Sequence, residues 1–173
     1  MTMAPGLRKF TLVVHVISSV SSLGAVACFL ALGLVGLGGA DAQTTRSLYV
    51  AMEAIARLII VPLVFASLVT GLAQALGTTW GLFRHYWVLA KLLLTVMAAV
   101  VLLLQMNIIN YVAAAAVEGI AGADLLGLRR SLVIHAVGGI AVLITTTVLS
   151  IYKPRGLTRY GWRKQQSQLR ERP

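Results

Sequence analysis

The chain has 173 residues, of which 58% are hydrophobic and only 12% are charged. Its mean hydropathy is +0.87, whereas an ordinary soluble domain has roughly 45–50% apolar and about 25% charged residues. A chain of this length forms one domain and cannot hide so much apolar surface inside a globule, which excludes a soluble enzyme. The same apolar excess excludes intrinsic disorder for most of the chain.

Four apolar stretches are long enough to cross a membrane as helices. About 20 residues, at about 1.5 Å each, span a hydrocarbon core of ~30 Å. The stretches predict spans at about residues 10–37, 50–76, 87–112 and 131–152. Their residues do not alternate between apolar and polar, as the strands of a membrane barrel would. We therefore predict an all-α transmembrane domain over residues 1–153, followed by a basic cytoplasmic tail over residues 154–173.

The connections between the spans are short and contain glycine, so consecutive helices must run in opposite directions. This predicts an antiparallel up-down-up-down bundle. The first span follows Arg8 and Lys9 and precedes Ala40-Asp41-Ala42, a pattern that also fits a signal peptide with its cleavage site. A signal-peptide core has only about 7–15 residues. The longer first stretch therefore favours a retained span over a cleaved leader.

The basic residues are distributed unevenly between the two sides of the predicted bundle. Eleven of the 15 Lys and Arg residues lie in the amino end, around the connection between spans two and three, and in the tail. The other four lie on the opposite side, at Arg46, Arg57, Arg129 and Arg130. Cytoplasmic loops are enriched in Lys and Arg. The distribution therefore predicts that both termini are cytoplasmic.

Polar residues inside a span are costly and mark candidate sites. In the first span, one helix face carries a histidine and three serines: His15, Ser18, Ser19 and Ser22. This face predicts a polar path or cofactor pocket with His15 as ligand or proton carrier, or, as the alternative, close helix packing through small residues. His85 lies at the cytoplasmic level of His15, which makes the two histidines a candidate pair for b-type haem. His135 lies near the outer side, too far from His15 to share one iron.

The second span carries charged residues toward its outer end. Glu53 and Arg57 have the i, i+4 spacing of a helical ion pair, and His135 lies near the outer end of the fourth span. These three residues predict an outward-facing polar patch that binds a charged group. The alternative is that the Arg57 side chain simply extends to the outer membrane interface.

Few other residues indicate a catalytic or metal-binding role. In the third span, Lys91, Thr95 and Gln105 share one helix face. The sequence contains no phosphate-binding loop, nucleophile elbow or zinc-protease motif. Copper handling calls for clustered Met, Cys or His residues, and here these are scattered. The sequence therefore favours a protein that is not an enzyme.

The tail GLTRYGWRKQQSQLRERP is basic and polar, with interleaved aromatic residues. Such a segment predicts contact with anionic lipid headgroups. The alternative is a flank that stops translocation and ends in a disordered segment. Nucleic-acid binding is not predicted, because no basic face on a folded surface is visible.

Residues 11–95 resemble a family of bacterial integral-membrane proteins. The features that match are His15 and Gly24, the Thr70-Gly71 pair, the GTTWG turn at residues 77–81, and the HYW motif followed by Lys91. That family carries a domain of unknown function and is distantly similar to the copper-resistance D membrane domain. The resemblance implies a four-helix protein of the bacterial plasma (inner) membrane. The bias toward Ala, Leu, Val, Gly and Arg is typical of a high-GC bacterium.

We therefore expect a non-enzymatic accessory subunit or a small transporter of unknown substrate. One alternative is a small b-type cytochrome that carries electrons, with haem b held by His15 and His85. Another is a copper-transport-related protein. The expected partners are the lipid bilayer, anionic headgroups at the tail, and a second copy of the chain or a partner membrane subunit.

Overall fold

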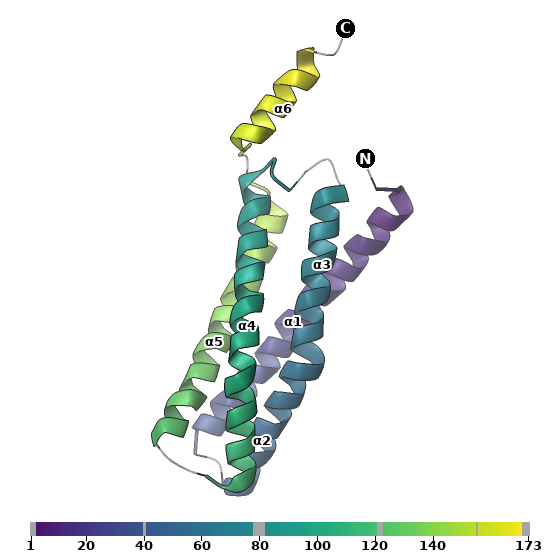
Figure 1. The fold of residues 1–173 in the computed structure, drawn as a ribbon. Coiled ribbons are helices and arrows are strands. Elements are labelled where there is room, and N and C mark those ends of the chain that lie inside the picture. The colour runs from purple at the N-terminus through teal and green to yellow at the C-terminus, as the bar shows by residue number, and fades with distance from the viewer. Residues whose placement is uncertain (1–2, 40, 78–81, 121–122, 155, 171–173) are drawn as a thin grey trace.

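The computed structural model describes residues 3–39, 41–77, 82–120, 123–154 and 156–170. Ala40 of the cleavage-site pattern, residues 78–81 of the GTTWG turn, and Arg155 and Arg172 of the tail lie outside the described residues. The regular elements of the described chain are helices (Figure 1): α1 (Pro5–Leu37), α2 (Ala42–Ile55), the π-helical turn η1 (Ala56–Ile60), α3 (Val61–Gly77), α4 (Tyr86–Glu118), α5 (Ala123–Tyr152) and α6 (Arg159–Arg170).

Four helical stretches are long and apolar enough to cross a membrane: Pro5–Leu37, the continuous helix Ala42–Gly77, Tyr86–Glu118 and Leu125–Tyr152. In the most apolar window of the α4 stretch, only 6% of the residues are buried inside the protein. A surface this apolar is stable in lipid rather than in water. The chain is thus built as a multi-pass helical membrane protein.

The helices extend beyond the predicted spans because backbone capping, rather than hydropathy, sets their ends. The second stretch begins at Ala42 because the Asp41 carboxylate accepts hydrogen bonds from the Thr44 backbone N–H at 3.0 Å and from its hydroxyl at 2.6 Å. Both bonds favour the ionised carboxylate and lower the pKa of Asp41. The third stretch continues to Glu118, where Gly119 takes the left-handed conformation, with φ of 71°.

Helix α6 occupies part of the segment that was expected to be a basic tail. Helix α5 ends at Tyr152, before Pro154, and a new helix begins at Arg159. In Figure 1, α6 extends from the end of the bundle that also holds the start of α1, the end of α3 and the start of α4. We call this the tail end of the bundle and the opposite end the far end.

The buried core lies toward the far end. It is formed by residues from the second half of α1, from α2 and η1, from the second half of α4 and from the first half of α5, among them Phe29, Tyr49, Met52, Ile60, Ile109, Val112 and Leu132. Glycine permits close approach of α1 to α2 here, because a Cβ atom on Gly36 would lie 2.9 Å from the Tyr49 hydroxyl. By contrast, no described residue of α3 is fully buried. The bundle is therefore packed tightly at the far end and loosely toward the tail end.

Candidate functional site

A cavity of about 370 Å³ lies between the helices, where the tight core gives way to the looser half. Residues of α1, η1, α3, α4 and α5 form its walls, and most of them are aliphatic. The polar groups on the walls are few: Ser22, Ser67, Thr95, Gln105, His135 and Thr146. Ligand sites typically combine an apolar lining with a few polar groups that fix orientation. This cavity is therefore the candidate site.

Gln105 is the polar residue of the cavity whose hydrogen bonding is incomplete. Gln105 is 8% exposed, and among the described residues its carbonyl oxygen Oε1 has no hydrogen-bond partner. A buried acceptor that lacks a partner is destabilising by roughly 1–3 kcal/mol. A water molecule or a ligand in the cavity can supply the missing donor.

Three other hydroxyl groups of the cavity walls are hydrogen-bonded within their own helices, and that of Ser67 pairs with Ser19 of α1. Ser22 donates to the Ser18 carbonyl at 2.8 Å, and Thr95 donates to the Lys91 carbonyl at 2.8 Å. Because these hydroxyls already have acceptors, they line the cavity without demanding a partner. Gln105 is therefore the residue of the cavity wall that calls for a hydrogen-bond donor from outside the chain.

The π-helical turn forms part of the cavity wall and has an identifiable cause. Pro62 has no backbone N–H and cannot continue the regular helical bonding pattern. The Val61 N–H instead bonds to the Ala56 carbonyl, five residues back. Ala56 and Ile60 of this turn line the cavity. Single π-helical turns within α-helices are frequent at functional sites.

His15 holds α1 against α3 on the tail-end side of the cavity. Its Nδ1 lies 2.9 Å from the Ser67 carbonyl and 3.2 Å from the Thr70 hydroxyl. The Ser19 and Ser67 hydroxyls are 2.8 Å apart, which adds a second link between the same helices. The His15 ring packs onto Gly71, where a Cβ atom would come within 3.0 Å of Cε1. These contacts are those of the close-packing alternative for this helix face.

Lys91 lies across the bundle from His15, on α4. Its ammonium group donates to the Ser150 hydroxyl and lies 5.7 Å from the centre of the Trp87 ring. Thr95, one turn further along α4, reaches the cavity. A positive charge therefore lies beside the tail end of the cavity.

The structure gives His15 and His85 different surroundings. The Nδ1 of His15 is bonded to the Ser67 carbonyl of α3, and the ring packs on Gly71. The backbone of His85 pairs with Leu157 of the tail, and its ring lies 6.3 Å from the Trp87 ring. Within the described residues there is also no group of three or more His, Cys, Asp or Glu side chains that could hold a metal ion. The haem and copper alternatives therefore stay predictions.

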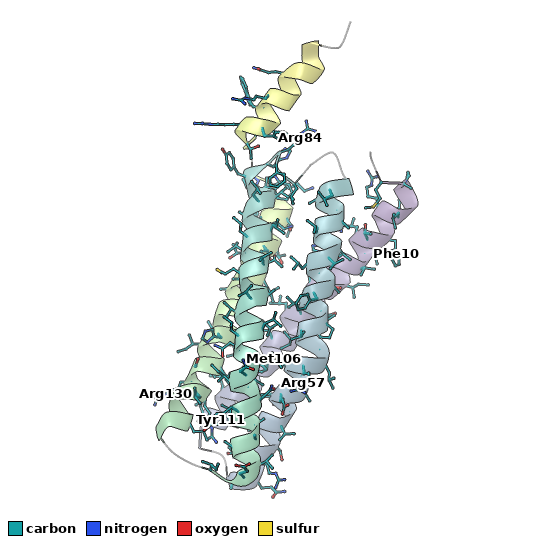
Figure 2. All side chains as sticks on the ribbon, viewed as in Figure 1. Phe10, Arg57, Arg84, Met106, Tyr111 and Arg130 are labelled. Atoms are coloured by element: carbon teal, nitrogen blue, oxygen red, sulfur yellow. The ribbon has the colours of Figure 1, made fainter. Side chains whose placement is uncertain are left out.

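The structure pairs two members of the expected polar patch and places the third elsewhere. Arg57 lies 3.1 Å from Glu53 and donates to the Asn110 side chain of α4 at 3.0 Å. Figure 2 shows Arg57 between α2 and α4. His135 lies exposed on α5, where its Nδ1 is 2.7 Å from the Ser131 carbonyl of its own helix. Asn110 is a partner of Arg57 that the sequence did not predict.

The comparisons with known proteins found no match. No family model, no curated protein and no solved structure matches the chain. The resemblance carried by His15, Gly24, the Thr70-Gly71 pair and Lys91 stays a prediction.

Proposed function

We propose that this protein is a small, non-enzymatic membrane transporter that binds its solute in the cavity between the helices. The observation that carries the proposal is the buried carbonyl oxygen of Gln105, which has no partner among the described residues, in a mostly aliphatic cavity. The π-helical turn on the wall supports it further, because a helix whose bonding pattern is already interrupted rearranges more readily. No reactive group is needed for this role.

The cavity walls define the solute. Aliphatic walls favour an apolar body, and Gln105 Oε1 requires a hydroxyl or N–H donor. Lys91 disfavours a cation at the tail end of the cavity. The proposed solute is therefore a small, neutral, mainly apolar molecule that carries one hydrogen-bond donor.

The proposal includes the arrangement of the protein in its membrane. An antiparallel up-down-up-down bundle is supported by contacts of the late residues of α3. The Met3 N–H, just before α1, bonds to the Gly77 carbonyl, and Gln74 donates to the carbonyl of Thr11, near the start of α1. The excess of Lys and Arg at the tail end supports cytoplasmic termini. We further propose the bacterial plasma membrane as its location, on the resemblance and the composition.

The second candidate function is an accessory subunit of a larger membrane assembly. The observation that favours it is Arg57, whose side chain is 57% exposed on a helix that spans the membrane. A charged side chain facing lipid is costly. A partner subunit or a second copy of the chain that covers the Glu53–Arg57 pair would remove that cost.

Cysteine labelling separates the two candidates. In a Cys28→Ser background, we would introduce Thr95→Cys or Leu132→Cys on the cavity walls, and Leu93→Cys on the lipid-facing side of α4 as the control. The protein would be reconstituted in vesicles and treated with a membrane-impermeant thiol reagent on one side at a time. A transporter exposes both cavity positions to both sides in turn. Labelling of each from one side only, or of neither, would favour the accessory subunit.

A further inference from the structure

The tail is joined to the bundle by a rigid joint rather than by a loose linker. Thr158 is 8% exposed, its hydroxyl donates to the Phe83 carbonyl, and its backbone N–H bonds to the Arg84 carbonyl at 2.9 Å. The same hydroxyl accepts the Gly161 N–H at 3.1 Å and thereby caps the start of α6. Figure 2 labels Arg84 where α6 meets the bundle.

Gly161 makes this joint specific. It is buried, and a Cβ atom at this position would collide with the Arg84 carbonyl oxygen. A residue with a side chain would therefore push α6 away from the turn before α4. A second backbone bond, from the Tyr86 N–H to the Gly156 carbonyl at 3.3 Å, holds the segment that leads to the joint. The first turn of α6 is thus fixed relative to the spans.

This turn borders an open surface hollow of about 280 Å³ beside the end of the bundle. Its walls are formed by the start of α4 and the start of the tail helix: Tyr86, Leu157, Thr158, Arg159, Trp162 and Arg163. The two arginines are four residues apart and lie on one face of α6. Tyr86 and Trp162 are 58% and 59% exposed. Such aromatic side chains are enriched where a membrane meets water.

Within the described part of the chain, neither Arg159 nor Arg163 has an ion-pair partner, so the charge of the hollow is uncompensated there. Two guanidinium groups one turn apart favour an anion, and their planar forks match phosphate oxygens. Because the hollow adjoins the ends of two spans, a phosphate attached to lipid reaches it without leaving the membrane.

We infer that this hollow is a binding site for the headgroup of an anionic phospholipid, held by Arg159 and Arg163 and bordered by Tyr86 and Trp162. The rigid joint keeps both arginines at the membrane surface, so the lipid fixes the depth of α4 and α5. This site is separate from the cavity that contains Gln105, and the proposal for it does not depend on the proposed transport function.

Native mass spectrometry of the full chain in detergent tests the site, with phosphatidylglycerol or phosphatidylcholine as the added lipid. We would compare the Arg159→Gln/Arg163→Gln variant with Arg8→Gln/Lys9→Gln, which removes the same charge from exposed positions of α1. Wild type should bind phosphatidylglycerol more tightly than phosphatidylcholine. At ~1 kcal/mol per basic residue, the first variant should lose about 20- to 30-fold in affinity. The α1 variant should lose less than about 3-fold.

A Gly161→Ala variant tests the role of the joint, because it keeps every charge and displaces α6. We expect it to weaken phosphatidylglycerol binding while size-exclusion profiles and helicity stay those of the wild type. Equal losses of phosphatidylglycerol affinity in the two charge variants would indicate diffuse electrostatic attraction and would overturn the site. The site would also be overturned if Gly161→Ala bound the lipid as tightly as wild type. Displacement of the lipid by millimolar inorganic phosphate would assign the hollow to free phosphate instead.

Discussion

Replacing Gln105 by methionine should make the protein more stable and less able to bind its solute. Methionine has about the length of glutamine but no acceptor, so the change removes the buried oxygen that lacks a partner. Leaving such a group unsatisfied costs roughly 1–3 kcal/mol. Allowing for imperfect packing of the thioether, we expect a gain of about 1–2 kcal/mol in the free energy of unfolding. For a chain of this size, that raises the unfolding midpoint by about 2–8 °C.

The matched control is Gln74→Met, because Gln74 already has a partner. Its Nε2 donates to the Thr11 carbonyl at 3.0 Å and links α3 to α1. Losing that bond should lower the free energy of unfolding by about 0.5–1.5 kcal/mol. Thermal unfolding of both variants in the same detergent, followed by circular dichroism, measures the difference. The two substitutions should change the free energy of unfolding in opposite directions. A Gln105→Met protein no more stable than wild type would refute the reasoning.

Three further predictions concern other parts of the molecule. Gly36→Ala should lower the free energy of unfolding by about 1–3 kcal/mol, because its Cβ atom would lie 2.9 Å from the buried Tyr49 hydroxyl. A Cβ atom at Gly24 of the same helix would meet no atom within 4 Å, so Gly24→Ala should be neutral or stabilising. Equal unfolding temperatures of the two variants in detergent would count against the close approach of α1 and α2. Arg57→Ala should leave the monomer folded but shift any larger assembly toward monomer, as measured by light scattering, and an unchanged assembly would exclude this pair from the interface. The hydrogen bonds that lower the pKa of Asp41 stabilise the start of α2 above the carboxyl's unfolded pKa, and this contribution is lost as pH falls through the lower folded value. The protection of the Thr44 and Thr45 amides against exchange should therefore fall in wild type as pH drops through the folded pKa of Asp41, but not in Asp41→Asn, which keeps a capping side chain; parallel profiles would contradict the cap.

The spans could be predicted from sequence because their apolar runs leave few alternatives. Hydropathy alone locates the helices, since every backbone group in lipid must be bonded within the chain. It does not locate their ends: Ala42 begins a helix because of Asp41 and Thr44, a bond that a hydropathy window does not register. The same holds for α6, which forms because Thr158 docks on the turn before α4.

The candidate site was only partly visible in the sequence. The shared face of Lys91, Thr95 and Gln105 was apparent from helical periodicity, and all three belong to one tract of α4 beside the cavity. What marks Gln105 is the absence of a partner for its oxygen, and only the packing of four other segments around it reveals this. The bond between Arg57 and Asn110 likewise depends on how α2 approaches α4.

The most direct test of the account compares two apolar probes of nearly equal shape in the wild-type protein. Indole carries an N–H donor, and 1-benzothiophene carries none. Isothermal titration of detergent-solubilised protein should show indole binding about tenfold more tightly, because only indole satisfies Gln105 Oε1. The preference should disappear in Gln105→Met. Equal affinity for the two probes in wild type, or a preference that survives in Gln105→Met, would contradict a solute site built around this oxygen.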